Sequence, residues 1–156
     1  KVTSLGVASG LVAGLVAITP GAGFVSPLAS LIIGLIGGAI CYTSITFLKS
    51  KLGYDDALDA FGCHGVGGIW GGIATGIFAW TAMNSAGANG LIHGNPKLVG
   101  IQLIATLATI VYAAVVTFII IKVINAVSSI RATAKDEQTG LDVTEHGEEA
   151  YGGMGV

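Results

Sequence analysis

The chain has 156 residues, of which 53% are hydrophobic and 10% are charged, and its formal net charge is −2 at pH 7. A water-soluble domain carries about 25% charged residues, so this composition excludes an ordinary soluble protein and is typical of a protein that lies in a lipid bilayer. A basic stripe is absent from the sequence, which excludes a nucleic-acid-binding surface.

Four apolar segments are each long enough to cross the hydrocarbon core of a bilayer, which takes about 20 helical residues. We predict membrane-spanning helices at about residues 4–23, 27–48, 57–80 and 97–127. The sequence therefore predicts an all-α membrane protein with a transmembrane region at residues 1–127 and a polar C-terminal tail at residues 128–156.

Lysine and arginine indicate the orientation, because they concentrate on the cytoplasmic side of membrane proteins. If the helices alternate in direction, the basic residues on the side of the tail are Lys1, Lys49, Lys51, Lys122, Arg131 and Lys135. Lys97 falls on the opposite side. The tail and the connection between the second and third spans are therefore predicted to be cytoplasmic.

Glycines recur every four positions, which places them on one helix face. The stripes are Gly6/Gly10/Gly14, Gly34/Gly38, Gly67/Gly71 and Gly68/Gly72/Gly76. In lipid such stripes let helix backbones approach closely. Because the third predicted span carries two of them, we expect it to be crowded on two sides and central to the bundle.

His64 is the sharpest candidate for a functional residue. It lies about seven residues into the third predicted span, which at about 1.5 Å per residue is roughly 10 Å below the start of the helix. An ionisable side chain at that depth is costly and indicates a functional site, although a neutral imidazole bonded to a neighbouring helix is the competing interpretation. Neutral imidazole has one donor and one acceptor nitrogen, which suits the passage of ammonia or water.

Asp59 is a second candidate, with two interpretations. It lies five residues before His64 and so is expected on a different helix face. It is either a first-turn carboxylate that the helix dipole favours or an acid with a role in gating or proton handling. His93 and His146 lack metal-ligand spacing, and no hydrolase or phosphate-binding signature is present in the sequence, so we predict no metal, no cofactor and no enzymatic activity.

Three ordered segments resemble the ammonium transporter (Amt/Mep/Rh) family. Residues 55–71, DDALDAFGCHGVGGIWG, are similar to the signature around the second of that family's two pore histidines. Residues 10–20, GLVAGLVAITP, and residues 140–148, GLDVTEHGE, resemble a membrane segment and the cytoplasmic tail motif of the same family.

The resemblance implies that the chain is the C-terminal part of an eleven-helix subunit, with the last four helices, and that the subunits form a homotrimer with one pore each. His64 would be the second pore histidine, and Ala60, one turn below it, would line the lower pore. The outer recruitment site, the phenylalanine gate and the first pore histidine would lie in a portion that precedes Lys1. The chain alone is therefore not expected to conduct.

The resemblance also implies the function: passage of ammonium or ammonia through a histidine-lined pore in the cell (plasma) membrane. It implies regulation through the tail, with a PII-type signalling protein as a candidate partner. The tail residues that carry this expectation are Gly140, Leu141, Asp142, His146, Gly147 and Glu148. The alternative function is a non-conducting structural or assembly subunit of a membrane complex. A proton-coupled transporter or rotary-ring subunit is disfavoured, because the spans offer no carboxylate beyond Asp59.

Overall fold

The computed structural model describes residues 3–149, and the regular structure within that range is helical throughout. This confirms the all-α prediction. The chain divides into two units, one ending at Ile110 and the other beginning at Val111. The long helix α5 (Lys97–Val127) has the bounds that the sequence predicts for the fourth span and contributes to both units. Residues 150–156 of the predicted tail lie outside the described residues.

The first predicted span is formed by α1 (Ser4–Ile18) and the short helix η1 (Thr19–Gly21). The Thr3 hydroxyl caps α1 by accepting a hydrogen bond from the Gly6 backbone N–H at 3.1 Å. α2 (Pro27–Thr43) begins with Ser26 as its cap and proline at its first position, which are favoured choices at a helix start.

The second predicted span is longer than expected. α2 continues through a wider π-helical segment, η2 (Ser44–Leu48), into α3 (Lys49–Leu52) before the helix ends. By length and composition, three described helices could cross a membrane: Ser4–Gly21, Pro27–Leu52 and Lys97–Val127. The third predicted span, which is rich in glycine, remains a prediction as a membrane crossing.

That third segment starts later than the sequence predicts. Its helix comprises the π-helical segment η3 (Phe61–Val66) and α4 (Gly67–Phe78), whereas the prediction placed the start near residue 57. Ala57 and Leu58 form a turn, and Asp59 has a φ of 54°, outside the helical region. The helix begins only after this turn, because the carboxylate that accepts its first free N–H groups comes from Asp56.

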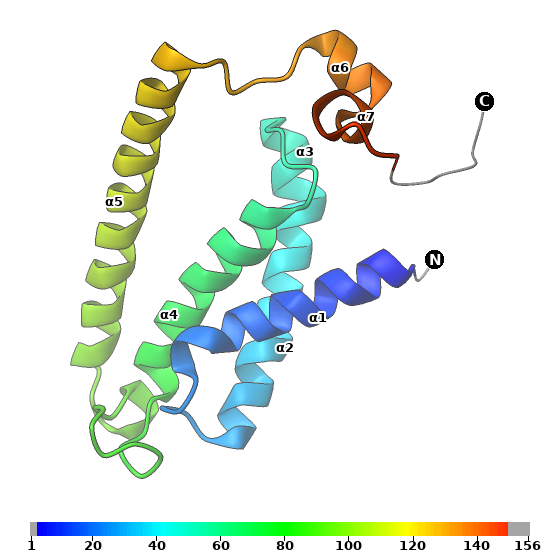
Figure 1. The fold of residues 1–156 in the computed structure, drawn as a ribbon. Helices are drawn as coiled ribbons and strands as arrows, with labels where there is room; N and C mark the ends of the chain where they lie inside the picture. The colour runs from blue at the N-terminus through cyan, green and yellow to red at the C-terminus, as the bar shows by residue number, and fades with distance from the viewer. Residues whose placement is uncertain (1–2, 150–156) are drawn as a thin grey trace. The chain divides into compact units, whose positions relative to one another are not determined.

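α4 lies at the centre of the first unit, and α2 runs beside it in the opposite direction (Figure 1). A Cβ atom built at Gly71 would clash with the Ala17 carbonyl oxygen of α1. On the other stripe, a Cβ atom at Gly72 would lie 3.0 Å from Thr106 Oγ1 of α5. The segment is therefore crowded on two sides at Gly71 and Gly72, as predicted, whereas a Cβ atom at Gly68 of the second stripe would meet no described atom within 4 Å.

Small and branched apolar side chains fill the space between α1, α2 and α4. One buried cluster comprises Ala17, Val25, Ala29, Ile33 and Ala74, and a second comprises Ala13, Cys41 and Cys63. The indole N–H of Trp70 on α4 donates a hydrogen bond to the Ile33 carbonyl of α2 at 3.0 Å. This bond, made on partly buried groups, fixes the two helices against sliding.

The connection from α4 to α5 is an ordered loop that contains η4 (Leu91–His93). Its Gly90 N–H donates to the Ala79 carbonyl at 2.7 Å, and the Asn89 side chain accepts from both the backbone and the hydroxyl of Thr81. The rings of Trp80 and His93 stack with centroids 4.8 Å apart. The second unit contains, after α5, the short helices α6 (Ala134–Thr139) and α7 (Leu141–His146).

Candidate functional site

His64 lies within η3, in the wider helical turn rather than in a regular α-helix. Such π-helical turns are rare and often occur at functional sites. Because the helix begins at Phe61, His64 is three residues from its start, and the predicted depth of seven residues was wrong. Nothing in the local propensities predicts the wider turn, but the glycines at positions 62 and 65 lower the cost of an irregular helix.

His64 is exposed, whereas Gly62 and Cys63 on the same helix are buried. Ala60, one turn earlier, is exposed like His64, and a Cβ atom built at Gly68, one turn later, would meet nothing within 4 Å. We call this strip of Ala60, His64 and Gly68 the open face. Within the described residues 3–149, His64 has no hydrogen-bond partner, so the competing interpretation of a satisfied histidine lacks support in this part of the chain.

The opposite side of η3 is pinned against α2 and η2. Gly62 and Cys63 are buried, and a Cβ atom at Gly62 would lie 2.5 Å from Cγ1 of Ile45. The thiol of Cys41 lies 3.7 Å from the Cys63 carbonyl oxygen, to which it donates a weak hydrogen bond. Because Gly62 and Cys63 must face inward to pack, His64 is turned outward onto the open face.

A set of polar contacts shapes the turn that precedes η3. The Asp56 carboxylate accepts the backbone N–H groups of Ala60 at 2.9 Å and Phe61 at 2.8 Å. The Asp59 carboxylate is paired instead with the Lys49 ammonium, at 2.6 Å. Asp56, not Asp59, is therefore the acid that stabilises the helix start. The first-turn interpretation of Asp59 was wrong for that reason.

Changing Asp56 to alanine tests this assignment. Loss of an N-terminal cap costs about 0.5–2 kcal/mol, and here two N–H groups lose their acceptor. We expect faster amide hydrogen exchange over residues 60–66 in the full-length protein, measured by mass spectrometry. Asp56→Asn keeps one acceptor oxygen, so its exchange rate should lie between those of the parent protein and the alanine variant. Equal exchange in the alanine variant and the parent protein would contradict the assignment.

A cavity of about 270 Å³ lies next to this turn, between α1, α2 and η2. Its polar side chains include Ser9, Thr46 and Asp59, and its other lining residues are Thr3, Leu5, Gly6, Gly10, Ala13, Gly38, Cys41, Tyr42 and Ile45. Among the described residues that line it, neither Ala60 nor His64 occurs. Ser9 and Thr46 were not predicted as site residues, because single hydroxyls in apolar helices carry no motif.

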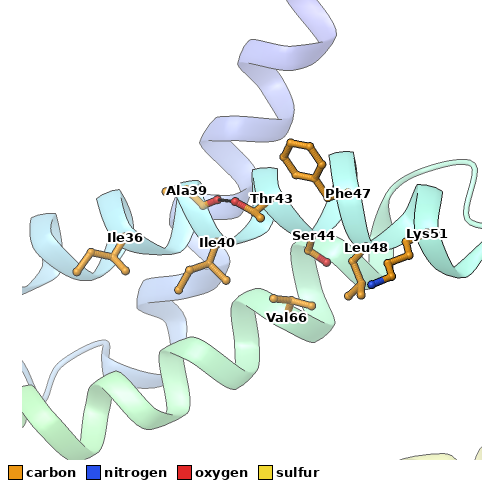
Figure 2. A pocket seen from close by; sticks show the side chains of 9 residues that line it. All are labelled: Ile36, Ala39, Ile40, Thr43, Ser44, Phe47, Leu48, Lys51 and Val66. Carbon is orange, nitrogen blue, oxygen red and sulfur yellow. Dashed lines mark hydrogen bonds between the residues drawn. The ribbon is translucent and has the colours of Figure 1, made fainter.

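An open apolar groove of about 650 Å³ runs along α2, η2 and α3 (Figure 2). Figure 2 shows Ile36 and Ile40 on its α2 side, Val66 from η3 and Lys51 near its α3 end. The Ser44 hydroxyl on its wall is buried and has no hydrogen-bond partner within the described range. The lining is almost entirely apolar, so the groove does not supply the donor and acceptor pattern of a polar substrate site.

The predicted tail residues come together in the second unit. Gly140 separates α6 from α7 with a φ of 111°, a conformation that L side chains rarely adopt, and Gly147 ends α7. The Glu148 backbone N–H donates back to the Asp142 carbonyl at 3.0 Å. Leu141 is 44% exposed, and His146 is also exposed. The motif thus forms one short helical hairpin with accessible side chains.

Comparisons with known proteins agree with this arrangement. The family model described as the Ammonium Transporter Family matches residues 1–151. The chain belongs to the ammonium transporter family. It is 59% identical over 151 residues to an ammonium transporter of Bacillus subtilis and 45% identical over 152 residues to ammonium transporter Amt1 of Archaeoglobus fulgidus. The match covers 97% of this chain in both cases, and 37% and 38% of those relatives.

The fold is also similar to solved structures of the ammonium transporter family. The crystal structure of Saccharomyces cerevisiae Mep2 matches with a TM-score of 0.77 and 39% identity over 86% of this chain and 31% of that one. Candida albicans Mep2 matches with a TM-score of 0.78 and 31% identity over 94% of this chain and 34% of that one. The family is one of membrane transporters, not enzymes. The chain spans about a third of the length of the relatives it matches.

Proposed function

We propose that the whole protein carries ammonium or ammonia across the cell membrane, and that this chain supplies the pore wall formed by His64 and Ala60. The observation that carries the proposal is the open face: an exposed histidine without a partner in the described chain, on a helix whose opposite side, with Gly62 and Cys63, is buried. The similar proteins of Bacillus subtilis and Aquifex aeolicus are named ammonium transporters, which supports the substrate.

The chemistry of imidazole favours the neutral form of the substrate. One ring nitrogen donates a hydrogen bond to the lone pair of ammonia, and the other accepts an N–H from the next molecule or ring. A single imidazole cannot replace the hydration shell of an ammonium ion, so the ion pays a large desolvation penalty at this position. Ammonium therefore gives a proton to water before it reaches His64, ammonia passes the ring, and ammonia takes a proton from water on the cytoplasmic side.

The proposal includes the placement of the chain in the membrane. The protein crosses four times within residues 1–127, and the tail lies in the cytoplasm. Lys49 and Lys51 at α3 and Lys122 near the end of α5 are then on the same side, as the positive-inside rule requires. Three such subunits form the trimer.

Uptake of radiolabelled methylammonium tests the function against its alternative. The full-length protein is produced in cells that lack their own ammonium transporters, and initial rates are measured over a range of concentrations. We expect saturable uptake that unlabelled ammonium inhibits. A structural or assembly subunit without a pore would give the rate of cells without the protein, which would overturn the proposal.

Regulation through the tail is the second part of the proposal, and it predicts an effect of the α6–α7 hairpin. Gly140→Ala forces an L side chain into a φ of 111°, so the hairpin should lose its geometry. We expect binding of a PII-type protein from the same organism to membranes that contain the transporter to weaken about tenfold. Gln138→Ala, at an exposed position of α6, is the matched control. If the PII-type protein does not bind the parent transporter under any nucleotide condition, the proposal of regulation through the tail is wrong.

A further inference from the structure

We propose that Lys49 and Asp59 are a positioning pair, which holds the turn before η3 in place and so sets the orientation of the helix that carries His64. The inference rests on the proposed function for its transport readout. It concerns two residues whose contact is invisible in the sequence, where they lie ten positions apart in different elements.

The Lys49 ammonium ties together both ends of a short turn. Its Nζ lies 2.6 Å from Asp59 Oδ1 and 2.5 Å from the Asp56 carbonyl oxygen. Asp56 in turn accepts the N–H groups of Ala60 and Phe61. One cation at the end of the second predicted span therefore anchors the residues that begin the helix of the third.

The backbone at Asp59 shows why an anchor is needed. Its φ of 54° is uncommon outside glycine, although aspartate and asparagine tolerate it better than other residues. The Asp59 carbonyl accepts the Cys63 N–H at 3.0 Å, so this residue also starts the hydrogen-bond ladder of η3. A change in the Asp59 backbone is thus transmitted in one step to Cys63, the neighbour of His64.

The pair has a second consequence for the cavity. Asp59 lines the cavity between α1, α2 and η2, and its side chain is 28% exposed. Paired with Lys49, the carboxylate is electrically compensated. Without Lys49, the Asp59 carboxylate would leave an uncompensated negative charge on the cavity wall, which would attract cations. Because both side chains are partly exposed, the pair contributes little to the stability of the whole fold, so its effect should appear in the local order of this turn and in transport.

A double-mutant cycle on the full-length protein tests the pair. Lys49→Met removes the charge but keeps an unbranched side chain, and Asp59→Asn removes the charge but tolerates the positive φ. We expect each change to lower the maximal rate of methylammonium uptake about fivefold with KM within about twofold, at equal amounts in the membrane. The double variant should be no slower than the slower single variant, because coupled residues are not additive. Lys49→Arg, which can keep the ion pair, should retain most of the rate.

Amide hydrogen exchange over residues 56–66 provides a readout that does not depend on transport. In both single variants the amides of this segment should exchange faster than in the parent protein, and by a similar factor. Exchange over residues 97–110 should be unchanged. The proposal that the two residues act as a pair would be overturned if the two changes had additive effects on uptake rate and on hydrogen exchange, or if both quantities were unchanged. If the parent protein takes up no methylammonium, the proposed function fails, and the exchange cycle alone decides the pair: coupled effects support it and independent effects overturn it.

Discussion

His64→Ala is expected to lower methylammonium uptake by the full-length protein about tenfold, while the protein still assembles in the membrane. The imidazole offers a donor and an acceptor on the open face, and loss of one hydrogen bond of about 1.4 kcal/mol at the rate-limiting barrier corresponds to tenfold. Assembly should survive, because the His64 side chain is exposed and packs on nothing that holds the first unit together.

Two further histidine variants test whether the hydrogen-bonding groups of His64 are needed, and whether the effect is specific to this position. His64→Gln keeps a donor and an acceptor in a side chain of similar reach, so its uptake should lie between those of the parent and the alanine variant. His93→Ala removes an imidazole that stacks on Trp80 in the loop before α5, and uptake should remain close to that of the parent. Unchanged uptake in His64→Ala would remove this residue from the pore.

Gly71→Leu is expected to prevent stable folding of the membrane region, and Gly71→Ala to destabilise it. Even the Cβ atom of alanine would clash with the Ala17 carbonyl oxygen and lie 2.8 Å from Cδ of Pro20. Both obstacles belong to a helix that is itself held by α2, so neither can move freely. Overpacking of this kind costs about 1–3 kcal/mol for one extra carbon and more for a branched side chain.

The melting temperature of the purified full-length protein measures this effect. The matched control is Gly100→Ala on α5, where a Cβ atom would meet no atom of the described residues within 4 Å. Alanine favours a helix over glycine by about 0.5–1 kcal/mol, so the control should be neutral or slightly stabilising. Equal melting temperatures for Gly71→Ala and the parent would show that α1 and α4 pack differently in the protein.

Several features of this protein follow from the sequence without tertiary structure. In lipid each backbone polar group must be satisfied within its own segment, so an uninterrupted apolar run forms a helix along nearly its whole length. That is why the predicted 97–127 coincides with α5. The two glycine stripes of the third segment follow from the four-residue period in the same way, and the structure packs them at Gly71, Gly72 and Gly76 but leaves Gly68 open.

Only the tertiary structure decided where the helix of His64 begins and which way the ring points. The sequence offers Asp55, Asp56 and Asp59 within five positions, and local rules cannot choose among them as the cap. In the structure Lys49 forms an ion pair with Asp59, and the Asp56 carboxylate accepts the N–H groups at the helix start. Likewise, His64 is directed outward because Gly62 fits against Ile45, a contact between elements that no local pattern records.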